Sequence, residues 1–409
     1  MANKERKEVS EKTLTLISSL LSIVGGLLVS FLFLYILEWT KAESNFGLPS
    51  SVYWNFMVYG VDTLSALIKV FYNAAPLIMC GLAVGFAFKA GLFNIGIVGQ
   101  YTVGAFFALI AVLLWGWPWW AGMIMAMIAG AFWGAIPGFF KAKFNINEVI
   151  TTIMLNWTAL YFTNFLLWSL PNIRTQFPYN RTDKISYVNI SGLLPDLGLQ
   201  DLTGSDYANI GIFIAIIIAV IMHIVLNKTT FGYEVKACGS NRHASDYAGI
   251  KAKKTIIQTF IISGALAGIG GAISYLAGTI QFNAYTELLS LGFNGIPVAL
   301  LAMSNPLGTI LSGIFIAYLQ VGGQAFEGVY SSEVTGIILS VIIYFSAFTL
   351  IISQFIRKYR VRQQNKEDNG EEIKFAKLLD VGKNLFNNDK KSDVNKSEIV
   401  DKDDEEVSK

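Results

Sequence analysis

The 409-residue sequence is poor in the residue types that build active sites in soluble proteins. Charged residues make up 15% of the chain, whereas an ordinary soluble domain carries about 25%. There are two cysteines, Cys80 and Cys238, and two histidines, His223 and His243. Neither pair has the spacing of a disulfide framework or of a zinc site. The composition therefore argues against a disulfide-stapled fold and against a metal centre.

Motifs for autonomous catalysis are also missing from the sequence. No Gly-x-x-x-x-Gly-Lys-Ser/Thr loop occurs, so the chain does not bind ATP in that way. No Ser/His/Asp or Cys/His combination is visible, and no run of acids within an apolar segment indicates a proton relay. We therefore expect a protein that is not an enzyme on its own.

Long apolar runs are what the sequence has instead. Hydrophobic residues make up 53% of the chain, and the mean hydropathy is +0.50. Runs of about twenty apolar residues, enough to cross a bilayer as a helix, recur along the chain. We expect an all-α integral membrane protein, a polytopic bundle of about ten transmembrane helices, some of them interrupted. The expected crossings are residues 14–37, 75–88, 95–114, 121–140, 149–170, 210–226, 255–277, 288–303, 307–321 and 334–352.

Charge sets the expected orientation and the domain boundaries. The cationic connectors, such as Lys141 and Lys143, all fall on one side, which the positive-inside rule makes the cytoplasm together with both termini. Residues 53–72, which contain Asp62 and Lys69, are less apolar and predict an interfacial or outer helix. The expected parts are a cytoplasmic N-terminus (1–12), a membrane domain (13–354) with an outer segment (171–207) and a cytoplasmic loop (228–254), and a charged, disordered cytoplasmic tail (355–409). Within the tail, residues 371–386 are either an amphipathic surface helix or solvated chain.

The cytoplasmic loop, residues 228–254, is long for a connector between membrane helices. Ser240 or Asn241 can cap a short helix over residues 242–248, and Gly249 can supply its left-handed end. Small side chains and one aromatic anchor then favour a docking surface for a partner protein, the alternative being a solvated loop. The residues that a partner would approach in this helix are Ala244, Ser245, Tyr247 and Ala248.

Three clusters of polar residues and helix breakers interrupt the apolar runs, where unpaired polar groups are costly. They are Gly91–Gln100, Asn145–Asn156 and Phe293–Ala302, the last containing Pro297, which predicts a break. Each either lines a path for a polar, uncharged ligand or satisfies neighbouring helices and backbone. The candidate path residues are Asn94, Gln100, Glu148, Thr152, Asn156 and Asn294.

These clusters and the loop, taken in order, resemble the permease subunits of bacterial ABC importers for simple sugars, branched-chain amino acids and nucleosides, and most of all the nucleoside permeases. Gly91–Gln100 matches the GLFNIG-x-x-GQ signature, and Asn147–Asn156 is similar to xEVI-x-TIMLN. Gly239–Ile250 matches G-x-N-x-x-A-x-x-YAGI, and Phe293–Leu301 is similar to F-D/N-GI-x-VALL. The resemblance covers about residues 75–352.

The resemblance implies a transport subunit for nucleosides that binds no cofactor itself, with ATP and Mg held by a separate ATPase. The implied partners are a cytoplasmic ABC ATPase, a second permease chain (identical or homologous), an extracellular substrate-binding lipoprotein that delivers ligand to residues 171–207, and membrane lipid, without nucleic acid. The implied location is the bacterial cell membrane. The implied ATPase-docking residues are Gly239, Ser240, Asn241, Ala244, Tyr247, Ala248 and Gly249.

The sequence departs from the family pattern at Val98, Asn147 and Pro297, where the family commonly has glutamate, histidine and alanine. These departures leave the substrate contacts open, so a simple sugar such as ribose or galactose is an alternative ligand. An ion-coupled secondary transporter is an alternative of another class, which would usually show intramembrane charges. A membrane-embedded transferase is a further one, for which only Glu148 and Asp62 come close to a catalytic set.

Overall fold

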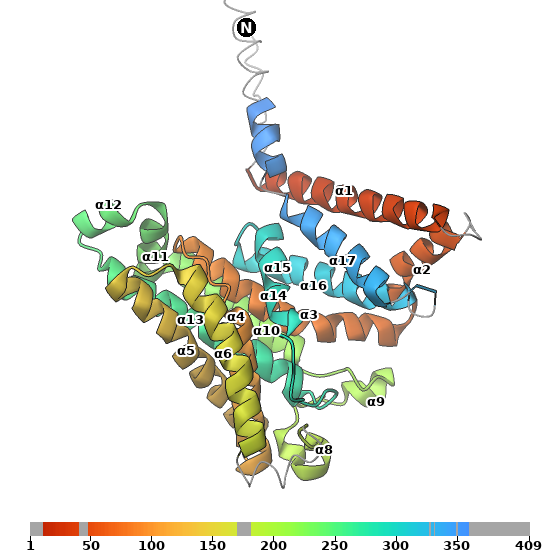
Figure 1. Ribbon diagram of the computed structural model, residues 1–409, viewed down its shortest axis with the longest axis horizontal. Coiled ribbons are helices and arrows are strands. Elements are labelled where there is room, and N and C mark those ends of the chain that lie inside the picture. The colour runs from red at the N-terminus through yellow and green to blue at the C-terminus, as the bar shows by residue number, and fades with distance from the viewer. Residues whose placement is uncertain are drawn as a thin grey trace, which may run out of the picture. The chain divides into compact units, whose positions relative to one another are not determined.

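The computed structural model describes residues 11–40, 48–169, 181–326, 329–330, 332–348 and 351–359. Helices dominate these residues (Figure 1), and no named strand occurs among them. Arg181 and Asn283 form an isolated bridge. The helices are α1 (Glu11–Trp39), α2 (Leu48–Asp62), α3 (Leu64–Lys89), α4 (Ile97–Leu109) with its π-helical extension (Ile110–Leu114), α5 (Trp119–Phe144), α6 (Glu148–Ser169), α8 (Ile185–Val188), α9 (Leu199–Thr203), α10 (Gly211–Lys228), α11 (Thr230–Ser240), α12 (Arg242–Tyr247), α13 (Ala252–Leu276), α14 (Ser290–Phe293), α15 (Gly295–Leu301), α16 (Pro306–Gly322) and α17 (Ser332–Ala347).

The all-α membrane fold is confirmed, with a correction to the number of long crossings. Within the described residues, 8 helices are long and apolar enough to span a membrane. The other two predicted crossings, residues 288–303 and 334–352, contain shorter apolar helices, Ser290–Leu301 and Gly336–Phe345. The first of these is divided at Asn294 into α14 and α15. Hydropathy identified both segments but did not predict how far each helix extends.

The prediction of one outer helix over residues 53–72 was wrong. The chain breaks at Thr63, whose hydroxyl accepts a hydrogen bond from Ala66 N at 3.1 Å and so caps α3. Residues 64–72 therefore belong to α3, which continues through Pro76 to Lys89. Asp62 and Lys69 reduced the apparent hydropathy here, whereas the helix boundary is set by the local cap.

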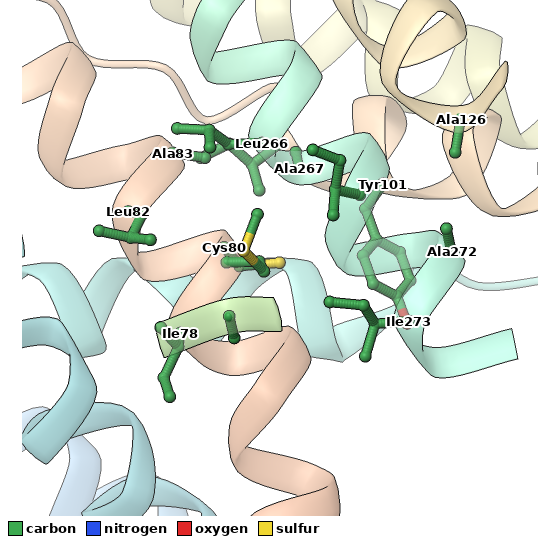
Figure 2. Packing of buried hydrophobic residues seen from close by; sticks show 14 of the residues in the cluster. Ile78, Cys80, Leu82, Ala83, Tyr101, Ala126, Leu266, Ala267, Ala272 and Ile273 are labelled. Carbon is green, nitrogen blue, oxygen red and sulfur yellow. The ribbon is translucent and has the colours of Figure 1, made fainter. Parts of the chain in front are cut away.

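The core of residues 1–350 is built around α3, α4 and α13, whose side chains are mostly buried. Gly264 and Gly268 of α13 face α5 so closely that an added Cβ would lie 2.2 Å from Gly130 O and 2.3 Å from Ala126 O. Glycine permits this approach because it has no side chain. Figure 2 shows part of this core, where Cys80 of α3 and Tyr101 of α4 lie beside α13.

The two ends of this bundle differ in their lysine residues and in the short helices that they carry. Lys89, Lys141 and Lys143 end α3 and α5 at the end that carries α11 and α12 (Figure 1). The opposite end carries α8, α9 and the loop of residues 277–289 that follows α13. Residues 351–359 are helical and belong to a separate unit that begins at Ile351. The predicted tail helix, residues 371–386, lies outside the described residues, as do residues 171–180 of the outer segment.

Candidate functional site

The first polar cluster forms a buried set of amides in the turn between α3 and α4. Asn94 and Gln100 are each 1% exposed. Asn94 Nδ2 donates to Gln100 Oε1 at 3.0 Å and to Ser263 Oγ of α13 at 2.8 Å, while Asn94 Oδ1 accepts from Gly96 N at 3.0 Å. Ser263 in turn donates to Ala83 O at 2.7 Å. These bonds join α3, α4 and α13, and they satisfy the amides within the chain.

The second cluster supplies a polar face of α6. Thr152 and Asn156, one helical turn apart and so on one face of α6, are both buried. Asn156 Oδ1 accepts from Gly99 N at 2.8 Å, and its Nδ2 donates to Ile95 O at 3.1 Å. Asn156 therefore satisfies the backbone where glycines open the start of α4. Thr152 Oγ1 donates to Val149 O of its own helix at 3.1 Å.

Glu148 is the first residue of α6, at the lysine-rich end of the bundle. Its carboxylate is 2.7 Å from Lys141 Nζ at the end of α5, and both side chains are less than one fifth exposed. The ion pair closes the short connection between the two helices. Sequence reasoning used Lys141 only to orient the chain and did not identify it as the partner of Glu148.

The third cluster brings Asn294 to the break between α14 and α15, where the Asn294 side chain is half-buried. The break precedes Pro297, contrary to the prediction. Pro297 lies in the first turn of α15, where the absent N–H would have no partner in the helix. An added Cβ on Gly292 would lie 2.7 Å from Val98 Cα, so the α14 segment packs on the start of α4.

The three clusters, separate in sequence, therefore meet around the start of α4. Asn156 bonds to Gly99, Gly292 contacts Val98, and Gly295 packs against Cys80 of α3. The interrupted segments touch one another here, which makes a junction of helices rather than three isolated kinks. Sequence reasoning missed Ser263, because a single serine in the apolar run of α13 gives no signal of its own.

The loop of residues 228–254 forms two helices rather than one. The predicted short helix is confirmed as α12, and Asn241 rather than Ser240 caps it, because Asn241 Oδ1 accepts from Ala244 N at 3.0 Å. Gly249, at φ +84°, ends the segment as predicted. The preceding α11 was not predicted. It begins at the cap Thr229, whose hydroxyl accepts from Gly232 N at 3.1 Å.

The residues of this segment divide into exposed and packed groups. Tyr247 is 95% exposed, an unusual position for a large aromatic side chain in a folded protein. Ser245, predicted to face a partner, is buried, and its hydroxyl donates to Asn241 O at 2.9 Å. Gly239 packs within the chain, since an added Cβ would lie 2.2 Å from Lys89 O. The exposed members of the predicted docking set are Ser240, Asn241, Ala244, Tyr247, Ala248 and Gly249.

The described residues contain no cluster of side chains that could serve as metal ligands. No group of three or more His, Cys, Asp or Glu side chains is placed to hold a metal ion among them. Cys80 and Cys238 are both buried and free. The polar side chains buried around the start of α4 are neutral amides and hydroxyls, a type of group that can hydrogen-bond an uncharged ligand.

Comparison with known proteins gives a consistent result. The family model described as "Branched-chain amino acid transport system / permease component" matches residues 66–347. The guanosine ABC transporter permease protein NupP of Bacillus subtilis is 34% identical over 86% of this chain and 98% of its own length. The nucleoside ABC transporter permease protein NupB of Lactococcus lactis is 34% identical over 86% of this chain and 95% of its own. The glucose ABC transporter permease protein TsgB13 of Haloferax volcanii is 33% identical over 74% of this chain and 80% of its own.

No solved structure matches the chain. The family match spans the interrupted helices, the amide cluster and both helices of the loop, so it covers every part of the candidate site. The apolar helices that are long enough to cross a membrane make the chain a multi-pass membrane protein. A permease is a transport subunit rather than an enzyme, and this chain belongs to the permease-component family of branched-chain amino acid transport systems.

Proposed function

We propose that this chain is the membrane-spanning subunit of an ATP-driven nucleoside importer. The observation that carries the proposal is the 34% identity to a guanosine permease over 98% of that protein's length. The neutral amide and hydroxyl groups buried between α3, α4, α6 and α13 support it, because a nucleoside is polar and uncharged. The residues of the proposed path are Asn94, Gln100, Glu148, Thr152, Asn156 and Asn294.

The lysine-rich end of the bundle faces the cytoplasm in this proposal, and both termini lie on that side. Lys89, Lys141 and Lys143 lie at this end, and cationic residues resist translocation across the membrane. A cytoplasmic ABC ATPase, which holds ATP and Mg, docks on α12 and its flanks. Tyr247 anchors the contact because it is exposed, and hot spots of interfaces are enriched in tyrosine.

The opposite end then faces outward and receives ligand from a substrate-binding lipoprotein. Tyr187, Ile190 and Leu202 of the outer segment are 83%, 77% and 80% exposed. Exposed apolar side chains on a short, folded segment favour a protein interface. The exposed apolar faces of α1, α5, α6 and α10 contact membrane lipid or a second permease chain, identical or homologous.

Uptake by intact cells tests the proposal. In a strain that lacks this chain, restoring it should restore uptake of labelled guanosine, and inactivating the partner ATPase should abolish it. Excess nucleosides should compete, whereas ribose and glucose should not. Uptake that persists without a functional ATPase would contradict the proposal and favour ion coupling.

Glucose or another simple sugar is the second candidate substrate, because the glucose permease relative is 33% identical over 74% of this chain. The same uptake experiment separates the two candidates. Restored uptake of labelled glucose that guanosine fails to inhibit would replace the nucleoside by a sugar and leave the permease role in place.

A further inference from the structure

A fully buried phenylalanine occupies an aromatic enclosure at the end of the bundle opposite the lysines. Phe282, 0% exposed, lies in the irregular loop of residues 277–289 that follows α13. Its ring centroid is 5.3 Å from that of Phe106 (α4), 5.4 Å from Tyr275 (α13) and 5.3 Å from Tyr285 of the same loop. These distances and the tilted or edge-on ring angles are those of favourable aromatic pairs. We call Phe106, Tyr275 and Tyr285 the aromatic box.

One side of the aromatic box is polar. The hydroxyls of Tyr275 and Tyr285 are 2.8 Å apart and share a hydrogen bond. Asn164 of α6 donates from Nδ2 to Tyr285 O at 2.7 Å, while its Oδ1 is buried and has no hydrogen-bond partner among the residues that the structure describes. A buried acceptor without a partner is rare in folded proteins. The box therefore borders an acceptor that no described residue of the chain bonds.

The loop that carries Phe282 is held by bonds from another segment rather than by regular structure. Thr182 N donates to Phe282 O at 2.8 Å, and Phe282 N donates to Thr182 Oγ1 at 3.0 Å. Gln281 Nε2 donates to Thr182 O at 2.8 Å. Thr182 belongs to the segment that continues into α8. Displacing this segment would remove three of the hydrogen bonds that hold Phe282 in the box.

Tyr72 connects the same loop to a pocket. The pocket has a volume of about 120 Å³ and lies between α3, α9 and α10. Tyr72 lines this pocket, and its hydroxyl is 2.5 Å from Thr279 Oγ1 in the loop. Phe71 and Tyr207 line the pocket as well, so its walls are partly aromatic. Tyr72 is therefore the link between this open volume and the loop.

We propose that the aromatic box is a binding site for the planar base of a nucleoside, and that Phe282 occupies that site when no ligand is present. The box offers aromatic faces to a flat ring, and Asn164 Oδ1 and the two tyrosine hydroxyls offer hydrogen bonds to its edge. A simple sugar has no such ring. This inference rests on the proposed nucleoside transport and assigns recognition of the base to residues outside the amide cluster around Asn94.

Photolabelling with 8-azidoguanosine tests the site directly. Membranes from cells that express the full-length chain are irradiated with the probe, and labelled peptides are mapped by mass spectrometry. Labelling should fall on the segment of residues 275–289, and excess guanosine should suppress it whereas excess ribose should not. Labelling confined to other segments, or suppressed equally by ribose, would overturn the proposal.

Two variants separate a base site from ordinary core packing. Phe282→Leu weakens the competing occupant but keeps the position apolar, so labelling should rise severalfold, up to about tenfold. Phe326→Leu is the matched control, because Phe326 is also 0% exposed and packs among aromatic rings, near Phe56 and Tyr330. It should leave labelling unchanged. Equal labelling in the two variants would contradict the role of Phe282.

Tyr285→Phe keeps the ring and removes one hydroxyl at the polar side. Labelling should fall about three- to tenfold, the worth of one hydrogen bond, and unchanged labelling would show that the hydroxyl only fills space. Guanosine uptake by the same cells separates this inference from the function on which it rests. No uptake overturns nucleoside transport itself, whereas uptake with labelling outside the box overturns only the base site.

Discussion

Two short polar stretches of this chain, Gly91–Gln100 and Gly239–Ile250, differ in their exposure to solvent. The stretch around Asn94 is buried, with Asn94 and Gln100 each 1% exposed and bonded to each other. The stretch around α12 is largely exposed, and Tyr247 is 95% exposed. The first uses its polar groups to hold helices together. The second leaves most of its side chains exposed, where the proposed partner would dock.

A backbone contact joins the two regions. An added Cβ on Gly91, at φ +68°, would lie 3.1 Å from Gly239 O, so the start of the Asn94 turn rests on the end of α11. Packed backbones at this distance move together, because closely packed interiors transmit displacement. We therefore expect a force applied to α12 to reach the amide cluster through this contact.

Asn94→Leu should have the largest effect on stability. The substitution leaves Gly96 N–H and the Gln100 amide without their partner, and each buried unsatisfied group costs about 1–3 kcal/mol. We expect the free energy of unfolding to fall by about 2–5 kcal/mol, measured as a lower midpoint of thermal unfolding in detergent. Thr158→Leu, on the exposed face of α6, is the control and should leave the midpoint unchanged.

Loss of uptake by Asn94→Leu without loss of stability would contradict the structural role. It would show that Asn94 serves the proposed path alone and does not hold the helices together.

Gly239→Ala should have a smaller but clear effect. The new methyl group would lie 2.2 Å from Lys89 O, and overpacking of this kind costs about 1–3 kcal/mol. Thermal unfolding and guanosine uptake should both be impaired, since α11 must shift away from the Asn94 turn. Gly336→Ala is the control, because an added Cβ there meets nothing within 4 Å. Equal stability in both variants would show that the contact between Gly91 and Gly239 is not tight.

Asn241→Ala should act locally. It removes the side-chain acceptor for Ala244 N, and loss of such a cap costs about 1 kcal/mol. Amide hydrogen exchange should increase in residues 244–247 while the midpoint of global unfolding stays the same. Asn241→Asp retains the acceptor and should restore protection. Unchanged exchange in Asn241→Ala would mean that the cap does not hold α12.

Local signals explain which parts of the structure were predictable from the sequence. The limits of α12 follow from Asn241 and Gly249, two residues that act within one turn of themselves. The polar face of α6 follows from the spacing of Thr152 and Asn156. The break at Thr63 was missed because the charges at Asp62 and Lys69 outweighed a single capping hydroxyl.

Contacts between distant segments were beyond such reasoning. The partners of Asn94 include Ser263, which is 169 residues away in the sequence. Phe282 is likewise buried by residues from α4 and α13, and its loop is held by Thr182. Hydropathy and spacing describe one segment at a time, so they predict neither the bond between Asn94 and Ser263 nor the burial of Phe282. The fold class was accessible from the sequence, but the pairing inside the site was not.

Tyr247→Arg should have the smallest effect on stability, and it tests whether α12 receives the force of an ATPase. The side chain is exposed, so the midpoint of thermal unfolding should not change. Copurification of the partner ATPase and ATP-driven guanosine uptake should each fall about tenfold or more, because a central aromatic anchor is lost from the interface. Normal uptake and normal copurification by Tyr247→Arg would contradict the account.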